Sequence, residues 1–544
     1  MERGGLVARA LAAAIAVSLL AVSGAGGAGA QTPKRGGVLD VVGAIEPPCL
    51  SVLVSPCKDA VLPIYGVLEG AFKLGPDYSW RPRLVSRVDV TTKPPFTLTY
   101  HIRPEARWSD GTPVSARDFV FTYTTRLRYP EVPEDDQYKT WVRSVRAVDR
   151  TTVRVVLRSR FAFWRGLFAV VLPEHALRGE DLEKVWIDRI HNPKTGAPIG
   201  NGPFLVQRWE RGKQLTLARN PGYSGTHPAY LDRVVFRYSL DPAEVADLFR
   251  NGEADIGQWQ FSPDLASELR RVPGVKLLFA PDSPGFEHLD IRMGPGGHRA
   301  LRNKLVRRAL AHGIDRVEIA RAVLGDEVDP NPRPLDNLLL RRSSRSYKSN
   351  WNVYRYDPAE ARRLLERAGC RRGADGIYSC AGERLSLRFA SRNVLSRRVQ
   401  TLELVQAQLR PAGVEVVPIY ASSRAHDQVL EARDFDVTLF AWFGAGADGA
   451  GIKDLYGCGG RQNYMGYCQR LVTRDLDQAD RIVDLARRAA VLNRADVQLA
   501  RDVPSIPLFE VPALAAVTPG VRNFLPTFSF FDPTWNAENW WLER

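Results

Sequence analysis

The alternation of apolar and polar residues is clearest between residues 198 and 257. Apolar and polar side chains alternate over Phe204–Trp209 and over Gln214–Ala218, on either side of a short Arg-Gly-Lys turn, which is the spacing of a β-hairpin. Val234–Tyr238 predicts a third strand, and Asp241, followed by a proline, predicts the start of a helix. Ala254–Gly257 begins another strand. This segment therefore combines strands with a helix.

A second run of alternating elements covers residues 356–442. Tyr356–Gly369 predicts a helix, because its apolar residues fall on one face. Leu385–Ala390 and Val414–Ile419 predict strands, and Ser396–Arg410 predicts the helix between them. Phe435–Trp442 predicts a further, buried strand. Such a β-α-β order suits a mixed sheet with helices on its faces.

Length and composition indicate a globular protein of several domains. The chain has 544 residues, which is too long for one hydrophobic core, so two or three domains are expected. Hydrophobic residues make up 44% and charged residues 25% of the chain, as in ordinary soluble proteins. The net charge is +14, but the basic residues are scattered and form no stripe with interleaved aromatic residues. Nucleic acid is therefore not an expected partner.

The first thirty residues have the layout of a secretory signal peptide. Two early arginines precede an apolar run at Leu11–Val22, and small residues at Ala28–Ala30 resemble a cleavage site. A membrane anchor is the alternative, but the apolar run is shorter than the roughly 20 residues that span a bilayer. The first cysteine is Cys49, so no lipoprotein cysteine follows the signal. We expect an exported protein in the periplasm or on the outer face of the cytoplasmic membrane.

The six cysteines fall into three local pairs: Cys49 with Cys57, Cys370 with Cys380, and Cys458 with Cys468. An even number of cysteines in an exported chain argues for disulfides. Local pairing is the simplest of the 15 possible connectivities, and the sequence alone does not prove it. A metal site is the competing interpretation, but the spacing within each pair is longer than the two to four residues of zinc knuckles.

Five motifs occur in a fixed order along the chain. They are WSDGTP at 108–113, GNGPFLVQRWERGKQLTLARNPGYSG at 200–225, GEADIG at 252–257, VRRALAHGIDR at 306–316 and YDPAEARRLLERAG at 356–369. Together they closely resemble the extracytoplasmic solute-binding proteins of the family 5 type, which are the peptide- and nickel-binding subunits of ABC importers. The resemblance extends from about Gly36 to Asn523.

The resemblance implies an α/β fold of the two-lobed periplasmic-binding-protein type II, in its large form with an extra subdomain. Mixed sheets with helices on both faces are expected. The implied division is a signal peptide at 1–30, a lobe I core formed by 31–65, 196–281 and 510–544, an extra subdomain at 66–195, and lobe II at 282–509.

The resemblance also implies a function. Such a receptor captures a peptide-like solute in a cleft between its lobes and delivers it to the membrane permease subunits of an ABC importer. It carries out no bond chemistry, so no catalytic residue, cofactor or metal is expected. We expect a monomer that closes around its solute by a hinge motion at the two chain crossings.

Eight residues are candidates for contact with the solute: Glu46, Trp259, Arg392, Trp442, Phe443, Asp448, Asn463 and Tyr464. Trp442 and Phe443 end a predicted strand at the cleft side, where the family has an aromatic residue in the pocket; packing in the core is the alternative. Dipeptide-binding members carry an aspartate for the peptide amine at the position of Ala445. Asp448, three residues later, is the possible replacement.

The remaining candidates come from loops and strand ends. Arg392 has the spacing of the family's arginine for the peptide carboxylate, a role that suits a guanidinium, although Arg397 and Arg398 are close by. Asn463 and Tyr464 resemble a segment that bonds an extended ligand backbone, and a structural loop role is the alternative. Glu46 lies in the loop after the first strand, where a surface carboxylate is the simpler interpretation.

Two other interpretations remain open from the sequence. The solute could be a glycoside or a metal chelate instead of a peptide. A secreted hydrolase is the rival from a different class, but the sequence contains no HExxH, GxSxG or GxxxxGK[ST] motif.

Overall fold

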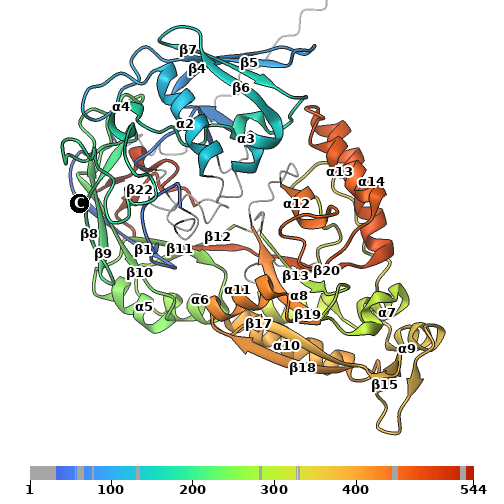
Figure 1. Ribbon diagram of the computed structural model, residues 1–544. Coiled ribbons are helices and arrows are strands. Elements are labelled where there is room, and N and C mark those ends of the chain that lie inside the picture. Colours follow the sequence, from blue (N-terminus) through green and yellow to red (C-terminus); the bar gives the residue numbers. More distant parts are fainter. Residues whose placement is uncertain are drawn as a thin grey trace, which may run out of the picture.

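The computed structural model describes residues 32–54, 57, 66–75, 79–129, 135–280, 285–325, 328, 331–443, 451–526 and 534–543. The predicted signal peptide lies outside these ranges. Within them, three sheets of four or more strands are surrounded by helices (Figure 1). The expected α/β class with mixed sheets is confirmed.

The largest sheet has seven strands in the order β12-β21-β11-β1-β10-β9-β8. Its strands are β1 (Val38–Gly43), β8 (Phe204–Glu210), β9 (Gln214–Arg219), β10 (Arg233–Tyr238), β11 (Ile256–Gln260), β12 (Lys276–Ala280) and β21 (Ala513–Val517). Helices α5 (Pro242–Arg250) and α6 (Pro263–Arg270) follow β10 and β11. β1 lies parallel to both of its neighbours, β10 and β11. The predicted hairpin is β8–β9.

A four-stranded sheet stands beside it, in the order β4-β5-β7-β6. Its elements are β4 (Val85–Val90), β5 (Thr97–Ile102), β6 (Val142–Ala147), β7 (Thr152–Leu157), α2 (Ala116–Arg128), α3 (Asp135–Trp141), α4 (Glu174–Leu177) and η2 (Trp164–Gly166). One hydrophobic core joins this sheet to the outer part of the seven-stranded sheet. We call these two sheets with their helices lobe I.

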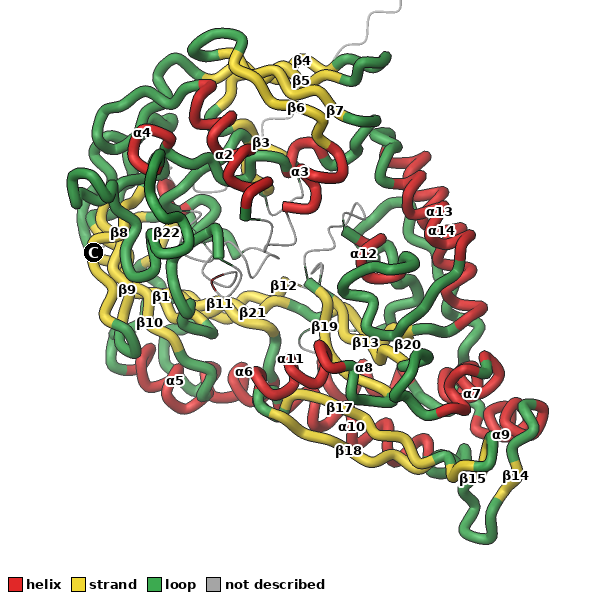
Figure 2. Tube along the Cα trace, viewed as in Figure 1, coloured by secondary structure: helices red, strands yellow, loops and turns green. Residues whose placement is uncertain are grey.

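The third sheet has five strands in the order β18-β17-β19-β13-β20. Its strands are β13 (Phe286–Ile291), β17 (Ser386–Arg392), β18 (Glu415–Ala421), β19 (Val437–Trp442) and β20 (Ser505–Glu510). Its helices are α7 (Lys304–His312), α8 (Arg316–Leu324), α9 (Pro358–Arg367), α10 (Ser396–Leu409), α11 (Ser423–Ala432), α12 (Ile452–Tyr456), α13 (Arg470–Ala479) and α14 (Leu485–Asp502). We call this unit lobe II; Figure 2 shows its strands among α8, α10 and α11.

Shorter elements complete the described chain. They are β2 (Phe72–Leu74), β3 (Trp80–Pro82), β14 (Arg371–Arg372), β15 (Tyr378–Cys380), β16 (Glu383–Arg384), β22 (Val521–Arg522), β23 (Trp541–Leu542), η3 (Arg299–Arg302) and η4 (Ala537–Asn539).

Side chains at the helix starts explain why several helices begin where they do. The Asp241 carboxylate accepts hydrogen bonds from the backbone N–H groups of residues 243 and 244, with Pro242 as the first helical residue of α5. The Asp315 carboxylate accepts hydrogen bonds from the N–H groups of residues 317 and 318 at the start of α8. Asp357 accepts from the Glu360 N–H at the start of α9. These bonds satisfy N–H groups that the first turn of a helix leaves unpaired.

The chain passes between the lobes twice, from β12 to β13 and from β20 to β21. The two crossings are bonded to each other, because the Val511 N–H donates to the Gly285 carbonyl oxygen at 2.9 Å. The Phe261 N–H, just after β11, donates to the Pro512 carbonyl oxygen, also at 2.9 Å. The crossings therefore form one hydrogen-bonded unit with the end of β11.

A buried ion cluster lies beside this unit. Glu287 of β13 accepts hydrogen bonds from Arg397 Nη2 at 2.8 Å and from Arg398 Nε at 2.9 Å. Arg397 also donates to the Gln260 side-chain oxygen and, at 2.9 Å, to the Phe261 carbonyl oxygen. Burial alone would raise the pKa of Glu287, but the two arginines hold this pKa below its ordinary value. Arg397 thus joins lobe II to the end of β11 in lobe I.

The second crossing strand carries a comparable contact. Glu510, at the end of β20, is buried and accepts hydrogen bonds from the Arg342 backbone N–H at 2.7 Å and from its Nε at 3.0 Å. Both strands that leave the crossings toward lobe II are therefore held by a glutamate–arginine pair.

The predicted local pairing of the cysteines is confirmed. Disulfides join Cys49 to Cys57, Cys370 to Cys380, and Cys458 to Cys468. The first lies in the loop after β1, the second ties the α9–β14 junction to β15, and the third closes the segment between α12 and α13.

Among the described residues, the helices are too short or too polar to cross a membrane. The same residues contain no group of three or more His, Cys, Asp or Glu side chains arranged to hold a metal ion.

We predict that Glu287→Gln lowers the free energy of unfolding by about 3–5 kcal/mol, because it leaves two buried guanidinium groups without their carboxylate. Urea unfolding followed by circular dichroism measures this. The control is Glu383→Gln, whose carboxylate is 44% exposed and pairs with Arg299 at 3.5 Å; it should cost less than about 1 kcal/mol. Equal losses in the two variants would contradict the assigned role of the buried cluster.

Candidate solute-binding site

A group of aromatic rings gathers at the end of β19, next to the first crossing. The half-buried Trp442 stacks on Tyr464 with ring centroids 6.0 Å apart and planes inclined by 8°. The edge of Phe440 meets the indole at 4.9 Å, and the buried His288 ring lies nearly parallel to it at 6.1 Å. We call these four residues the aromatic cluster.

Strand register explains how the cluster forms. β13 and β19 are antiparallel, with Phe286 opposite Trp442 and His288 opposite Phe440. Alternate residues of a strand point to the same face of the sheet, so Phe440, Trp442 and His288 share one face. Leu439 of β19 belongs instead to the large hydrophobic core on the other face, where α10 packs. One face of the lobe II sheet is thus an ordinary core and the other carries the cluster.

Tyr464 reaches the cluster from a separate loop. Arg292 Nη1, just after β13, donates to the Tyr464 carbonyl oxygen at 3.1 Å, and the Met293 N–H donates to the Met465 carbonyl oxygen at 2.9 Å. The disulfide Cys458–Cys468 closes the same loop. These contacts fix the phenol ring against the indole.

Asn463 holds this loop from within. Its Nδ2 donates to the carbonyl oxygens of Gly457 and Tyr467 at 2.9 and 2.6 Å, and its Oδ1 accepts from the Tyr467 N–H at 3.1 Å. The side chain is buried and its amide is used within the loop. Asn463 therefore acts on the site by shaping the loop that presents Tyr464.

Phe443 continues from the cluster to the crossing. A β-carbon added to Gly285 would lie 2.0 Å from the Phe443 ring, so the ring packs directly on this glycine. The Trp442 indole nitrogen is buried and has no hydrogen-bond partner among the described residues. A buried donor without a partner is costly in a protein interior. The site therefore offers half-buried aromatic side chains, a surface suited to a partly apolar ligand.

Positive charge lies on the other side of the cluster. Arg392, the last residue of β17, pairs with Asp427 of α11 at 2.6 Å, and within the part of the chain that the structure describes its buried Nε has no partner. Burial, with a smaller contribution from Arg392 and Arg398, lowers the pKa of the nearby His426 to about 4, so this imidazole is neutral near pH 7. The His426 Nε2 bonds the Thr438 hydroxyl at 3.1 Å.

Two predicted residues lie elsewhere in lobe I. The Glu46 carboxylate accepts from Trp209 Nε1 at 2.8 Å and from the Gly212 N–H at 3.0 Å, so it ties the first loop to the β8–β9 hairpin. Trp259 in β11 is 1% exposed and packs against Phe249 of α5, with ring centroids 6.4 Å apart. The structure thus gathers Trp442, Phe443 and Tyr464, with Asn463 behind them.

Asp448 and Ala445 fall outside the described residues. His288, by contrast, is a member of the cluster that the sequence analysis missed. No spacing in Phe286–Ile291 marks His288, because only the pairing with Phe440 of β19 shows which face it shares.

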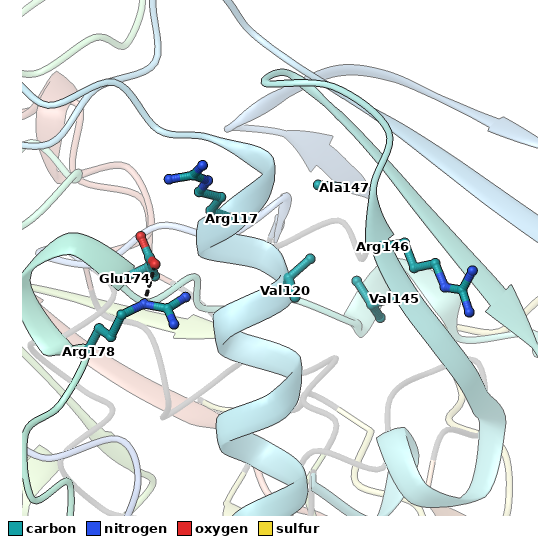
Figure 3. Close-up of a pocket in the computed structure, with 7 residues that line it drawn as sticks. All are labelled: Arg117, Val120, Val145, Arg146, Ala147, Glu174 and Arg178. Carbon is teal, nitrogen blue, oxygen red and sulfur yellow. Dashed lines mark hydrogen bonds and ion pairs between the residues drawn. The ribbon is translucent and has the colours of Figure 1, made fainter.

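Two surface cavities lie away from these residues. The larger, of about 750 Å³, is lined by Arg117, Val120, Val145, Arg146, Ala147, Glu174 and Arg178, between α2, β6 and α4. Figure 3 shows that Arg146 points away from Arg117 and Arg178, so the three guanidinium groups do not converge, and Glu174 pairs with Arg178. The other, of about 510 Å³, lies between β3 and the C-terminal segment. Neither is lined by a residue predicted from the sequence.

The fold and the motifs agree with one known family. The family described as bacterial extracellular solute-binding proteins, family 5 Middle, matches residues 79–463. The chain belongs to this family. Its members are solute-binding proteins, which are found in the periplasm or outside the cell.

Individual relatives support the assignment. The oligopeptide-binding protein OppA of Mycobacterium tuberculosis is 27% identical over 468 residues, covering 84% of this chain and 76% of OppA. Among solved structures, the periplasmic EDTA-binding protein EppA matches with a TM-score of 0.86 at 20% identity, covering 94% of this chain and 98% of EppA. The oligopeptide-binding protein AppA of Bacillus subtilis, in complex with a nonapeptide, matches with a TM-score of 0.77 at 19% identity, covering 94% and 100%. The expected family resemblance is confirmed.

We predict that Asn463→Ala lowers the free energy of unfolding by about 2–4 kcal/mol, because it removes the side-chain partner of the buried Tyr467 carbonyl and N–H groups and one of the two donors to the Gly457 carbonyl oxygen. The midpoint of chemical unfolding, followed by fluorescence, reports the change. Gln462→Ala is the control: this neighbouring side chain is only partly buried, and its loss should cost about 0.5 kcal/mol or less. If Asn463→Ala were as stable as the control, the amide would not hold the loop.

Proposed function

We propose that this protein is an exported receptor that captures a peptide-like solute and delivers it to the permease subunits of an ABC importer. The observation that carries the proposal is the aromatic cluster at the end of β19, which lies beside the chain crossings. Family membership and the peptide-binding relatives OppA and AppA support it. The receptor works as a monomer and is exported by the signal peptide at residues 1–30.

The proposal also includes a division of the chain into two lobes and an extra subdomain. Residues 31–65, 196–281 and 510–544 form the core of lobe I, residues 66–195 its extra subdomain, and residues 282–509 lobe II. The separate sheets and the two crossings support this division.

The chemistry of the cluster suggests which parts of a solute it takes. The half-buried side chains of Trp442 and Tyr464 leave some aromatic surface exposed, which suits apolar or aromatic side chains of a peptide. Arg392 is a candidate for a solute carboxylate, although Asp427 already pairs with it. Because alanine stands at position 445, we assign recognition of a solute amino group to Asp448.

A non-peptide solute is the second candidate. EppA, whose name describes an EDTA-binding protein, shares the fold with a TM-score of 0.86. An anionic chelate would also use the arginines at this end of lobe II, and Ala445 removes one carboxylate that would repel it.

Native mass spectrometry of the mature, oxidised protein, purified without refolding, tests the proposal. A heterogeneous set of short peptides released from the protein supports peptide capture. A single chelate or saccharide, or a protein that ignores peptide libraries, contradicts it and leaves the binding-protein fold unchanged.

We predict that Trp442→Leu weakens solute binding about 10–100-fold, as expected when a central aromatic contact is removed. Isothermal titration calorimetry with a co-purified solute measures the effect. The control is Tyr420→Leu on β18, where the ring is 39% exposed and belongs to the edge strand; its affinity should match the wild type. Equal affinities in all three proteins would remove Trp442 from the site.

A further inference from the structure

The two lobes touch at a second place that is distant from the crossings. The Ala162 N–H, in the segment of lobe I before η2, donates to the Asp480 carbonyl oxygen of lobe II at 2.7 Å. Asp480 lies in the loop that joins α13 to α14. Figure 1 shows this loop beside the four-stranded sheet of lobe I, well away from β12 and β13 at the crossings.

Lobe I presents three aromatic rings at this contact. Trp141 stacks on Phe161 with centroids 4.9 Å apart and planes inclined by 14°, and Phe161 meets Phe163 edge-on at 5.9 Å. All three rings are buried and belong to the core of lobe I. We call Trp141, Phe161 and Phe163 the aromatic ledge.

Lobe II places two arginines on the ledge. The guanidinium carbon of Arg488, in α14, lies 4.7 Å from the centroid of the Phe163 ring. The guanidinium carbon of Arg481 lies 5.9 Å from the centroid of the Trp141 indole. Both distances are in the range of cation–π attraction. Arg488 is 3% exposed, which strengthens the attraction because little water competes for the cation.

We propose that the aromatic ledge and the two arginines form a latch that holds the lobes closed. Arg481 and Arg488 are positioning residues: they raise the affinity for the solute by favouring the closed form, without touching the solute. This inference rests on the proposed function, because a latch matters for affinity only if the solute binds between the lobes.

The covalent connections make the latch the contact that must break on opening. The chain crosses between the lobes only at β12–β13 and β20–β21 among the described elements, and Arg397 braces the crossings. A rotation about the crossings moves residues near them little and residues at the latch much further. Among the described residues, the latch includes one backbone hydrogen bond and two ring contacts, which can separate together.

The charges at the contact suit this role. Burial raises the pKa of Asp480 to about 7. The positive charges of Lys453, Arg488 and Arg481 partly oppose this rise, and the negative charge of Asp477 adds to it. Near neutral pH the Asp480 carboxyl is therefore only partly ionised. Asp480 therefore carries less negative charge beside the two arginines than an ordinary aspartate would.

The strength of a cation–π pair sets the expected size of the change in solute affinity. A single cation–π pair corresponds to roughly a 2–30-fold change in an equilibrium constant. If the latch forms only in the closed protein, breaking one pair shifts the open–closed equilibrium by that factor toward the open form. The observed solute affinity then falls by a factor of up to the same size.

Small-angle X-ray scattering of the mature, oxidised protein without solute tests the latch directly. Arg488→Met and Phe163→Leu should each increase the radius of gyration, and the double variant should increase it no further, since both remove the same contact. Arg488→Lys should restore part of the compactness because it keeps a cation above the ring. The matched control is Arg487→Met, an exposed arginine one residue earlier, which should leave the radius of gyration unchanged.

Solute titration of the same proteins gives the second readout. Arg488→Met and Phe163→Leu should each bind the co-purified solute roughly 2–30-fold more weakly, with Arg487→Met unchanged. If Arg488→Met does not fold, Arg481→Met and Phe163→Leu carry the test. Wild-type compactness and affinity in the latch variants, or additive effects in the double variant, would overturn the inference.

Failure of the proposed function gives a different result. If the protein binds no solute but its Arg488→Met variant opens in solution, the latch stands as a conformational contact, and its role in solute affinity is refuted. If the protein binds peptides, but its latch variants neither open nor bind the solute more weakly, the proposed function stands and the latch is refuted.

Discussion

The rest of the structure depends on how the two crossings are held together. The Val511 N–H bonds the Gly285 carbonyl oxygen, and the guanidinium of Arg397 reaches both Glu287 in lobe II and the Phe261 carbonyl oxygen in lobe I. A buried charge of this kind is stable only with all of its partners in place. The cluster therefore fixes one relative position of β11, β13 and β20, and the two sheets are oriented by it.

The candidate site follows from this arrangement. β13 leaves the first crossing and pairs with β19, so the last residues of β19 come to lie next to the crossing. Trp442 and Phe443 are placed there by register, and Phe443 rests on Gly285 itself. A ligand that touches the aromatic cluster consequently lies next to the crossings between the lobes.

Local features could be predicted from the sequence, and long-range contacts could not. The β8–β9 hairpin, the caps at Asp241 and Asp357 and the three cysteine pairs depend on residues close together in the chain. The stack of Trp442 on Tyr464 depends on the Arg292 contact that positions the loop, which no spacing reveals. Glu46 shows the same limit: its place in a loop was correctly predicted, whereas its bonds to the β8–β9 hairpin depend on tertiary packing.

Arginines contribute to the contact between the lobes in two different ways, one at the crossings and one at the aromatic ledge. At the crossings, Arg397 forms charge-assisted hydrogen bonds with fixed directions, and such bonds tolerate little displacement. At the ledge, Arg481 and Arg488 lie over ring faces, where the attraction is weaker and has no strict direction. A hinge needs a rigid pivot, and a reversible closure needs a contact whose strength is comparable to that of a few ligand interactions. The charge-assisted contacts at the crossings and the weaker ring contacts at the ledge suit these two requirements, so we expect the lobes to separate at the ledge first.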